Sequence, residues 1–240
     1  MAKYGGAKLH QLEIEKHYQN MWQCAWPLIN SNQTSYDPYL CGKLDTRRGI
    51  TLLARITAPV NSAITEFLQE LYALEPQQYY YPSCDLHVTV MSVLSCIQGY
   101  QLSLIDKPKY VDLIRSIVKN TPRFFIEFDG ITLADSGVLL RGYVNNQSLE
   151  NLRSRLRIDI KNCDAPHSMD TRYTIVTAHS TVMRFRQKLQ NPLGFADFLC
   201  ANRQRYFGQV EVTQLELVVN DWYQRQGNTE SLGTFQLSVV

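Results

Sequence analysis

The chain has 240 residues, of which 45% are hydrophobic, 19% are charged and 11% are aromatic, and its formal net charge is +2. This composition is typical of a globular protein with a buried core, and it excludes a disordered or collagen-like chain. The small net charge does not predict a general nucleic-acid binder, although it is compatible with a local basic cleft.

No hydrophobic run approaches the ~18 residues that span a bilayer, and the first residues lack the hydrophobic segment of a signal peptide. We therefore expect a cytoplasmic protein, monomeric and with no membrane partner. The six cysteines are widely spread and form no C-x-x-C pair. This spacing predicts reduced thiols rather than disulfides.

Residues 1–48 differ from the rest of the chain. Helical spacing of hydrophobic residues predicts a helix over 8–28, which Pro27 should end or kink. The polar, turn-rich residues 30–48 read as a connecting loop. We expect this extension to pack on a main domain that comprises 49–240.

The main domain mixes strands and helices, with hairpins rather than repeated strand–helix–strand units. This order predicts an α+β fold with antiparallel sheets. Two halves each contain a strand, a helix and a histidine-bearing strand, which indicates internal duplication. The expected strands are 49–60, an extended segment 79–94, a hairpin of 124–133 and 138–144, then 175–185, 210–219 and 233–239. The expected helices are 61–74, one that Asp106 caps and that runs to Val118, 148–160 and 193–204.

Two short motifs carry the chemistry: His87-Val88-Thr89-Val90 and His179-Ser180-Thr181-Val182. We place both inside strands, where side chains alternate between the two faces. His87 and Thr89 therefore share one face, and so do His179 and Thr181. We expect the intervening hydrophobic residues to face the other way and pack on helices.

Two imidazoles and two hydroxyls on rigid strands can perform acid–base chemistry at phosphorus. The ordinary pKa of histidine, near ~6.5, allows one ring to be neutral and the other protonated at neutral pH. The neutral ring can take a proton from a nucleophile, and the protonated ring can give one to a leaving oxygen. The hydroxyls can donate hydrogen bonds to phosphoryl oxygens. This arrangement requires no metal and no cofactor.

The cysteine and histidine spacing leaves a zinc site as an alternative. Cys84 lies three residues before His87, and Cys163 lies four residues before His167. In a strand, however, Cys84 and His87 point to opposite faces. We therefore predict no metal ligands.

The context of both motifs resembles the 2H phosphoesterase superfamily, which includes LigT-like 2′-5′ RNA ligases and cyclic nucleotide phosphodiesterases. The segment Cys84-Asp85-Leu86-His87-Val88-Thr89-Val90 is similar to the first family motif. The segment Ala178-His179-Ser180-Thr181-Val182-Met183-Arg184 is similar to the second, with an arginine three residues after the threonine. The resemblance spans about 49–240 and leaves residues 1–48 unexplained.

The resemblance implies two pseudo-symmetric lobes, each an antiparallel sheet with helices on its outer face, that face each other across a cleft. His87, Thr89, His179 and Thr181 would line that cleft as catalytic residues. One departure is Ser180, where the family usually has an apolar residue. Because Ser180 should face away from the cleft, we expect a difference in packing and not a loss of chemistry.

Three further residues are candidates for substrate binding. Tyr79 and Tyr81 should point to the same face of their segment and could stack on a base, or they are ordinary strand residues. Regular alternation puts Arg184 on the face opposite His179, unless a bulge or the strand end redirects it. The resemblance implies that Arg184 contacts phosphate.

Three arginines on one predicted helix, Arg153, Arg155 and Arg157, read as a solvated surface, with a nucleic-acid contact as the alternative. The sequence thus predicts a metal-independent phosphodiesterase whose substrate is a nucleotide or an RNA end with a 2′,3′-cyclic phosphate or a 2′-5′ linkage. The alternatives are a hydrolase of a cyclic oligonucleotide signal or of an ADP-ribose cyclic phosphate, and a non-catalytic module that binds RNA ends.

Overall fold

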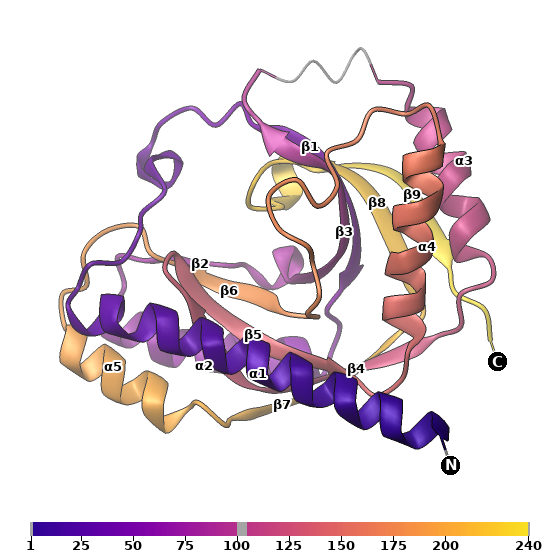
Figure 1. Cartoon of the computed structure of the whole chain (residues 1–240). Coiled ribbons are helices and arrows are strands. Elements are labelled where there is room, and N and C mark those ends of the chain that lie inside the picture. The colour runs from indigo at the N-terminus through magenta and orange to yellow at the C-terminus, as the bar shows by residue number, and fades with distance from the viewer. Residues whose placement is uncertain (1, 100–104, 240) are drawn as a thin grey trace.

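The structure is a computed structural model that describes residues 2–99 and 105–239, with side chains from residue 10 onwards. These residues form two antiparallel sheets and five α-helices, which loops and short 3₁₀ turns connect (Figure 1). The helices are α1 (Ala2–Asn30), α2 (Val60–Leu74), α3 (Lys107–Val118), α4 (Ser148–Asn162) and α5 (Pro192–Ala201). The strands are β1 (Arg48–Arg55), β2 (Tyr79–Tyr80), β3 (His87–Ile97), β4 (Phe124–Ala134), β5 (Gly137–Val144), β6 (Ser180–Arg184), β7 (Tyr206–Val212), β8 (Gln214–Asn220) and β9 (Glu230–Gln236).

The first sheet has the strand order β3-β1-β8-β9, and α3 and α4 lie beside it (Figure 1). All central residues of β1 are buried, as expected for an inner strand that is covered on both faces. The pairing of β3 with β1 shifts register at three places. Such bulges bend a strand and increase its twist, so β3 curls along its length.

The second sheet has the order β2-β6-β5-β4-β7, and Figure 1 shows α1 in front of it and α2 behind it. The buried stripe of α1 includes Tyr18 and Trp22. The Tyr18 hydroxyl both donates to the Gly142 carbonyl and accepts from the Gly142 amide, at 3.0 Å each. The helix before the main domain is thus bonded directly to β5. No helix in the described residues has the length and hydrophobicity to cross a membrane.

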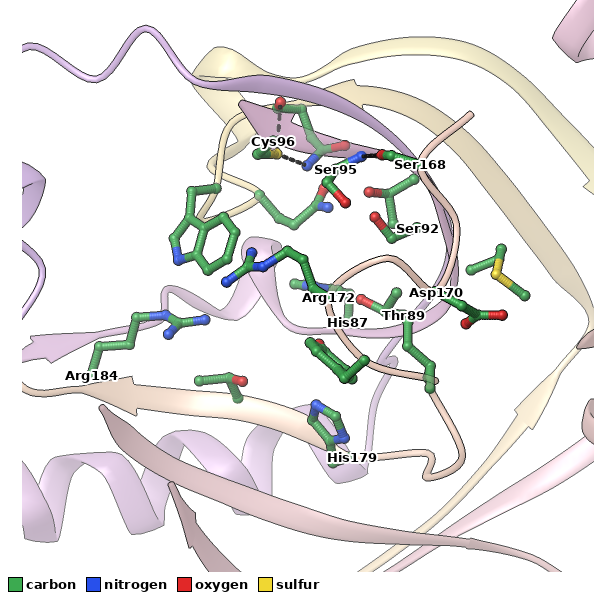
Figure 2. A pocket seen from close by; sticks show the side chains of 18 of the residues that line it. His87, Thr89, Ser92, Ser95, Cys96, Ser168, Asp170, Arg172, His179 and Arg184 are labelled. Carbon is green, nitrogen blue, oxygen red and sulfur yellow. Dashed lines mark hydrogen bonds between the residues drawn. The ribbon is translucent and has the colours of Figure 1, made fainter. Parts of the chain in front are cut away.

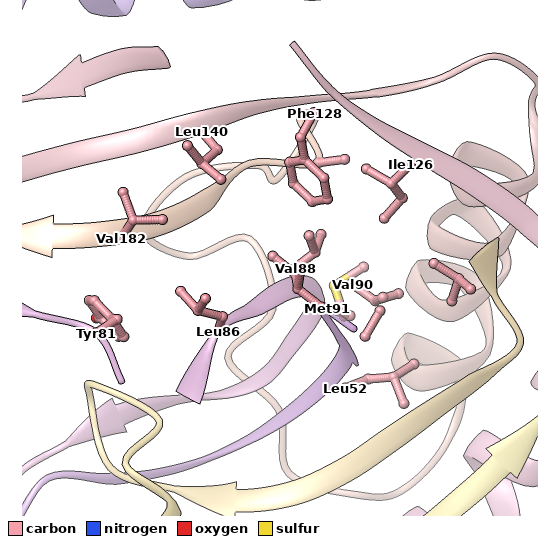
Figure 3. Close-up of a cluster of buried hydrophobic side chains, with 14 of the residues drawn as sticks. Leu52, Tyr81, Leu86, Val88, Val90, Met91, Ile126, Phe128, Leu140 and Val182 are labelled. Carbon is pink, nitrogen blue, oxygen red and sulfur yellow. The ribbon is translucent and has the colours of Figure 1, made fainter. Parts of the chain in front are cut away.

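The main core lies between the two sheets. Leu86, Val88 and Val90 extend from β3 and its approach toward Phe128 and Val182 of the second sheet (Figure 3). The prediction named only helices as partners; α4 does contact β3, and strands of the second sheet complete the packing. The consequence is that both motif strands share one rigid hydrophobic layer, which fixes their relative position.

The predicted strand 175–185 is shorter in the structure, because regular pairing begins only at Ser180. Arginines from α4 bind the carbonyls of the preceding segment: Arg153 donates to Thr177 O at 2.8 Å and Arg157 to Ile175 O at 2.9 Å. Since these groups are satisfied by side chains, the segment needs no sheet partner. His179 accordingly lies just before β6 and not inside it.

Other predicted boundaries differ as well, and the first predicted strand, 49–60, already ends at Arg55. The segment 79–94 is broken by a 3₁₀ turn at Ser83–Asp85, which follows Pro82, a residue that has no amide hydrogen for a ladder. The predicted strand 210–219 is two strands, β7 and β8, that belong to different sheets. Helix α1 continues through Pro27 to Asn30. The hairpin of β4 and β5 and the Asp106 cap on α3 are confirmed.

Candidate active site

His87 is oriented by the 3₁₀ turn that precedes β3. Its Nδ1 lies 2.7 Å from the carbonyl oxygen of Asp85. A carbonyl only accepts hydrogen bonds, so Nδ1 carries a proton and donates. In the neutral ring the proton-free nitrogen is therefore Nε2, which is the form that a general base requires.

His179 is held by the side chain of Thr177, whose Oγ1 lies 2.7 Å from Nδ1. The Thr177 side chain also lies near the hydroxyl of Tyr18 on α1, close enough to act on its pKa in the lowering direction. Tyr18 is almost fully buried and is fixed by the backbone of Gly142. The N-terminal helix thus supports the orientation of the second histidine through one intervening threonine.

One pocket brings both motifs together. His87, Thr89, His179, Thr181 and Arg184 all line it (Figure 2). All five side chains are partly exposed, in contrast to the buried residues between them. Ser180 is buried and does not line the pocket, in agreement with the strand-face argument. The sequence pattern therefore located all four motif side chains on the same cavity.

Arg184 reaches the pocket because β6 is irregular. The register of β5 with β6 shifts between Val138 and Leu139, which places Thr181 and Met183 against consecutive residues of β5. This bulge turns Arg184 toward the side of His179. The Arg184 Nε donates to the Tyr81 hydroxyl at 2.8 Å, which fixes the guanidinium.

The two candidate tyrosines lie behind Arg184 rather than open to a base. Tyr81 lines the pocket but is only 3% exposed, and its hydroxyl is engaged by Arg184. Tyr79 is absent from the pocket lining; its ring packs against Tyr81 and Tyr223, with centroids 5.2 and 5.6 Å away. The prediction that Tyr79 could stack on a base does not fit this position, because its ring packs on other aromatic rings outside the pocket.

Arg153 of α4 connects the two motif segments through hydrogen bonds to their backbone carbonyls. Its Nε donates to Val90 O at 3.0 Å, and its Nη2 donates to Thr89 O at 3.0 Å and to Thr177 O at 2.8 Å. The side chain is 1% exposed, so its interpretation as part of a solvated surface was wrong. One cation thus joins β3 to the segment that carries His179.

Both histidines are neutral in the free protein near pH 7. Burial lowers the pKa of His87 to about 4, and Arg55 and Arg184 contribute in the same direction. Burial also lowers the pKa of His179 to about 4, with further contributions from Arg153 and His87. A bound phosphate anion would oppose these effects, because an opposite charge nearby favours the protonated ring.

Several pocket residues lie outside the motifs and were not predicted. Loop residues 164–179 pass over β3, where Ser168 Oγ accepts from the Ser95 amide at 2.7 Å. Farther along this loop, the Arg172 guanidinium lies 4.3 Å from the ring centroid of Trp222. Only the high serine content of β3 hinted at a polar cavity wall. Within the described residues, no group of three or more His, Cys, Asp or Glu side chains is placed to hold a metal ion.

The Thr177 contact leads to a testable expectation. Thr177→Val keeps the shape of the side chain but removes the oxygen beside His179 Nδ1. A net hydrogen bond of ~1 kcal/mol corresponds to about a five- to tenfold loss in the rate of phosphodiester cleavage. We expect this loss in kcat with little change in KM, and recovery in Thr177→Ser. Equal kcat in the Thr177→Val and wild-type proteins would contradict the role of Thr177 in orienting His179.

Comparisons with known proteins identify the family and the fold of the chain. Residues 59–223 match the family model described as 2′-5′ RNA ligase superfamily. The structure is similar to that of TT0787 from Thermus thermophilus, with a TM-score of 0.55, 14% identity and coverage of 80% of this chain and 98% of that chain. It is also similar to the structure of E. coli LigT complexed with 3′-AMP, with a TM-score of 0.51 and 16% identity. The similarity covers 80% of this chain and 99% of the LigT chain. The search of curated proteins gives no match.

Proposed function

Because the chain belongs to the 2′-5′ RNA ligase superfamily of 2H phosphoesterases, we propose that it is a metal-independent phosphodiesterase acting on a nucleotide or an RNA end. The scissile group would be a 2′,3′-cyclic phosphate or a 2′-5′ linkage. The observation that carries the proposal is the convergence of two histidines, two threonines and Arg184 on one pocket. The structural neighbour LigT, with 3′-AMP and with ATP, supports a nucleotide ligand.

The proposed reaction needs only the side chains of this pocket. The phosphoryl oxygens accept hydrogen bonds from Thr89, Thr181 and Arg184, which neutralise the charge that grows at phosphorus. One histidine removes a proton from water as its oxygen bonds to phosphorus. The bond from phosphorus to the ribose oxygen then breaks, and the other histidine protonates that oxygen. The two histidines exchange roles in the reverse, ligating direction.

A panel of substrates tests the proposal directly. It comprises 2′,3′-cyclic nucleotides, a 2′-5′ dinucleotide, a 3′-5′ cyclic dinucleotide, an ADP-ribose cyclic phosphate and a short RNA, each incubated with the protein in EDTA. We expect cleavage of the first two classes and no loss of rate in EDTA. If the protein cleaves only the cyclic dinucleotide, or only the ADP-ribose cyclic phosphate, that compound class is the substrate and the proposed one is wrong. Tight binding of RNA ends without turnover would overturn the enzymatic proposal.

The lowered histidine pKa values predict an unusual pH profile. In the free enzyme the pair with one proton is most abundant near pH 4 and is depleted as the pH rises. We therefore expect kcat/KM to be highest below about pH 5 and to fall toward pH 7. The optimum of kcat should lie at higher pH, because the bound phosphate anion raises both pKa values.

This profile is measured in a buffer series of constant ionic strength, with circular dichroism at every pH. The spectroscopic control is needed because the unfolded chain binds more protons than the folded one between about pH 4 and 6.5, so stability decreases as the pH falls through that range. A kcat/KM profile centred near ~6.5, the ordinary histidine pKa, would contradict the burial argument.

A further inference from the structure

A second cavity adjoins the catalytic pocket on the side of helix α1. Its volume of about 400 Å³ lies within the ~300–1,000 Å³ of typical ligand sites, and we call it the α1-side cavity. Helix α1 lines it with His17 and Met21, which lie one helical turn apart on the same face. The β4–β5 hairpin lines it with Ala134 and Leu139, and the remaining lining includes residues 172–177. The N-terminal extension is therefore part of a cavity as well as a cover for the second sheet.

The α1-side cavity and the pocket along β3 meet at the catalytic residues. We call the pocket along β3, which Figure 2 shows, the β3-side cavity. His179, Thr181 and Arg184 line both cavities, whereas His87 and Thr89 line only the β3-side cavity. A phosphate bound by Thr181 and Arg184 therefore lies where the two cavities join. A phosphodiester has two ester substituents, and each cavity can hold one of them.

The side chains at this junction suit an anion and a flat ring. Arg172 and Arg184 line both cavities, and within the described residues neither forms an ion pair with a carboxylate. Instead, Arg172 lies over the ring of Trp222, which also lines both cavities. The ring of Tyr173, a further shared residue, is 60% exposed and thus open to contact. None of the described residues that line the α1-side cavity is Asp or Glu, so no carboxylate there opposes a phosphate ester.

We propose that the α1-side cavity binds one nucleoside of a dinucleotide substrate while the β3-side cavity binds the other. This inference rests on the proposed function, which puts the scissile phosphate at the junction of the two. Bases stack on aromatic rings and on arginine planes, and Met21, Leu139 and Val176 give the α1-side cavity further apolar surface. A 2′,3′-cyclic mononucleotide has one nucleoside and fills only one cavity. We therefore expect the internucleotide linkage to be the better substrate.

Three ligands distinguish the two cavities. A 2′-5′-linked adenosine dinucleotide has a nucleoside on each side of its phosphate, whereas adenosine 2′-(methyl phosphate) and adenosine 5′-(methyl phosphate) each keep one of the two. Their affinities are measured calorimetrically in EDTA on the full chain with His87→Ala, so that no ligand is cleaved during the titration. Because a second base is stacked, we expect the dinucleotide to bind at least about tenfold more tightly than either ester. Equal affinity of the dinucleotide and the tighter ester would overturn the inference.

Two matched substitutions each fill one cavity with a phenylalanine ring. Ala134 of β4 lines only the α1-side cavity and Ser92 of β3 lines only the β3-side cavity, and both are partly exposed strand residues. Ala134→Phe should weaken binding of the dinucleotide and of one methyl ester about tenfold, and leave the other ester within about twofold. Ser92→Phe should weaken the dinucleotide and that other ester. If Ala134→Phe changes no affinity, or if both variants weaken the same ester, the two-cavity arrangement is wrong.

The contribution of helix α1 is tested by His17→Ala. His17 is exposed and alanine is the best helix former, so the helix should remain intact. The loss of one polar contact corresponds to about a fivefold weaker affinity, and we expect it for the same ligands that Ala134→Phe affects. His10→Ala is the matched control, because His10 lies on the same helix but lines neither cavity. Equal affinities in the two histidine variants would overturn the contribution of α1.

The binding experiment is independent of turnover. If the dinucleotide binds more tightly and the variants show the expected pattern, but the wild-type protein cleaves no phosphodiester, the two-cavity site stands and the proposed reaction fails. If the protein cleaves cyclic phosphates but binds the dinucleotide no more tightly than an ester, the reaction stands and the two-cavity site fails. Should the melting curve show that Ala134→Phe does not fold, Thr174→Phe replaces it, because Thr174 is an exposed loop residue that lines only the α1-side cavity.

Discussion

Replacing either His87 or His179 by alanine should lower kcat/KM for phosphodiester cleavage by ~10²–10⁴-fold. Each imidazole would carry a separate proton transfer, so the loss of either ring leaves one transfer without its catalyst. The double variant should be only slightly worse than either single one, because groups that act as one unit are not additive. The measurement is steady-state kinetics on the substrate that the panel identifies.

His167→Ala is the matched control for these variants. His167 lies on the loop over β3 but is exposed and does not line the pocket. Its loss should leave kcat/KM within about twofold, whereas thermal melting should show that all three alanine variants fold. Full activity in His87→Ala or His179→Ala, with the fold intact, would contradict the two-histidine mechanism.

The positions of the motif side chains could be predicted because they depend on local geometry. A period of two residues puts His87 and Thr89 on one face whatever the strand pairs with. The same rule holds for His179 and Thr181, even though His179 precedes the regular strand. Likewise, the polar stretch around Asp106 predicts a helix cap from side-chain chemistry alone, and Asp106 accepts from the Lys109 amide.

The parts that could not be predicted depend on contacts between distant segments. Arg153 looks like a surface residue in sequence, because nothing near it shows that three buried carbonyls from other segments need a donor. The bulge that turns Arg184 into the pocket arises from its pairing with β5. Trp222 lies far along the chain from either motif, and only the folding of β8 beside β1 brings it to the pocket.

Residues 1–48 illustrate the same limit. The hydrophobic stripe of the helix predicts that it packs on something, but it does not identify Tyr18 as the residue that lies near Thr177. That link requires both partners to be placed in three dimensions. The extension therefore contributes to the orientation of His179, although the family match begins only at residue 59.

Arg153→Met should be the most destabilising single substitution at this site. It removes donors from the carbonyls of Val90, Thr89 and Thr177, all at 2.8–3.0 Å. Each buried acceptor left unpaired costs ~1–3 kcal/mol, so we expect the free energy of unfolding to fall by about 3–6 kcal/mol. Native proteins typically have a free energy of unfolding of ~5–15 kcal/mol, so this loss would be a large part of the total. Urea titration measures it.

Arg155→Met is the matched control, since Arg155 lies on the same helix but is partly exposed. It should change the free energy of unfolding by less than ~0.5 kcal/mol. Burial lowers the pKa of Arg153 to about 10, so its cation persists at pH 7 and Arg153→Lys preserves the charge. Lysine lacks the planar fork that spans three carbonyls, so it should recover only part of the loss. Full recovery by lysine would mean that charge, and not the bridging geometry, holds the two motif segments together.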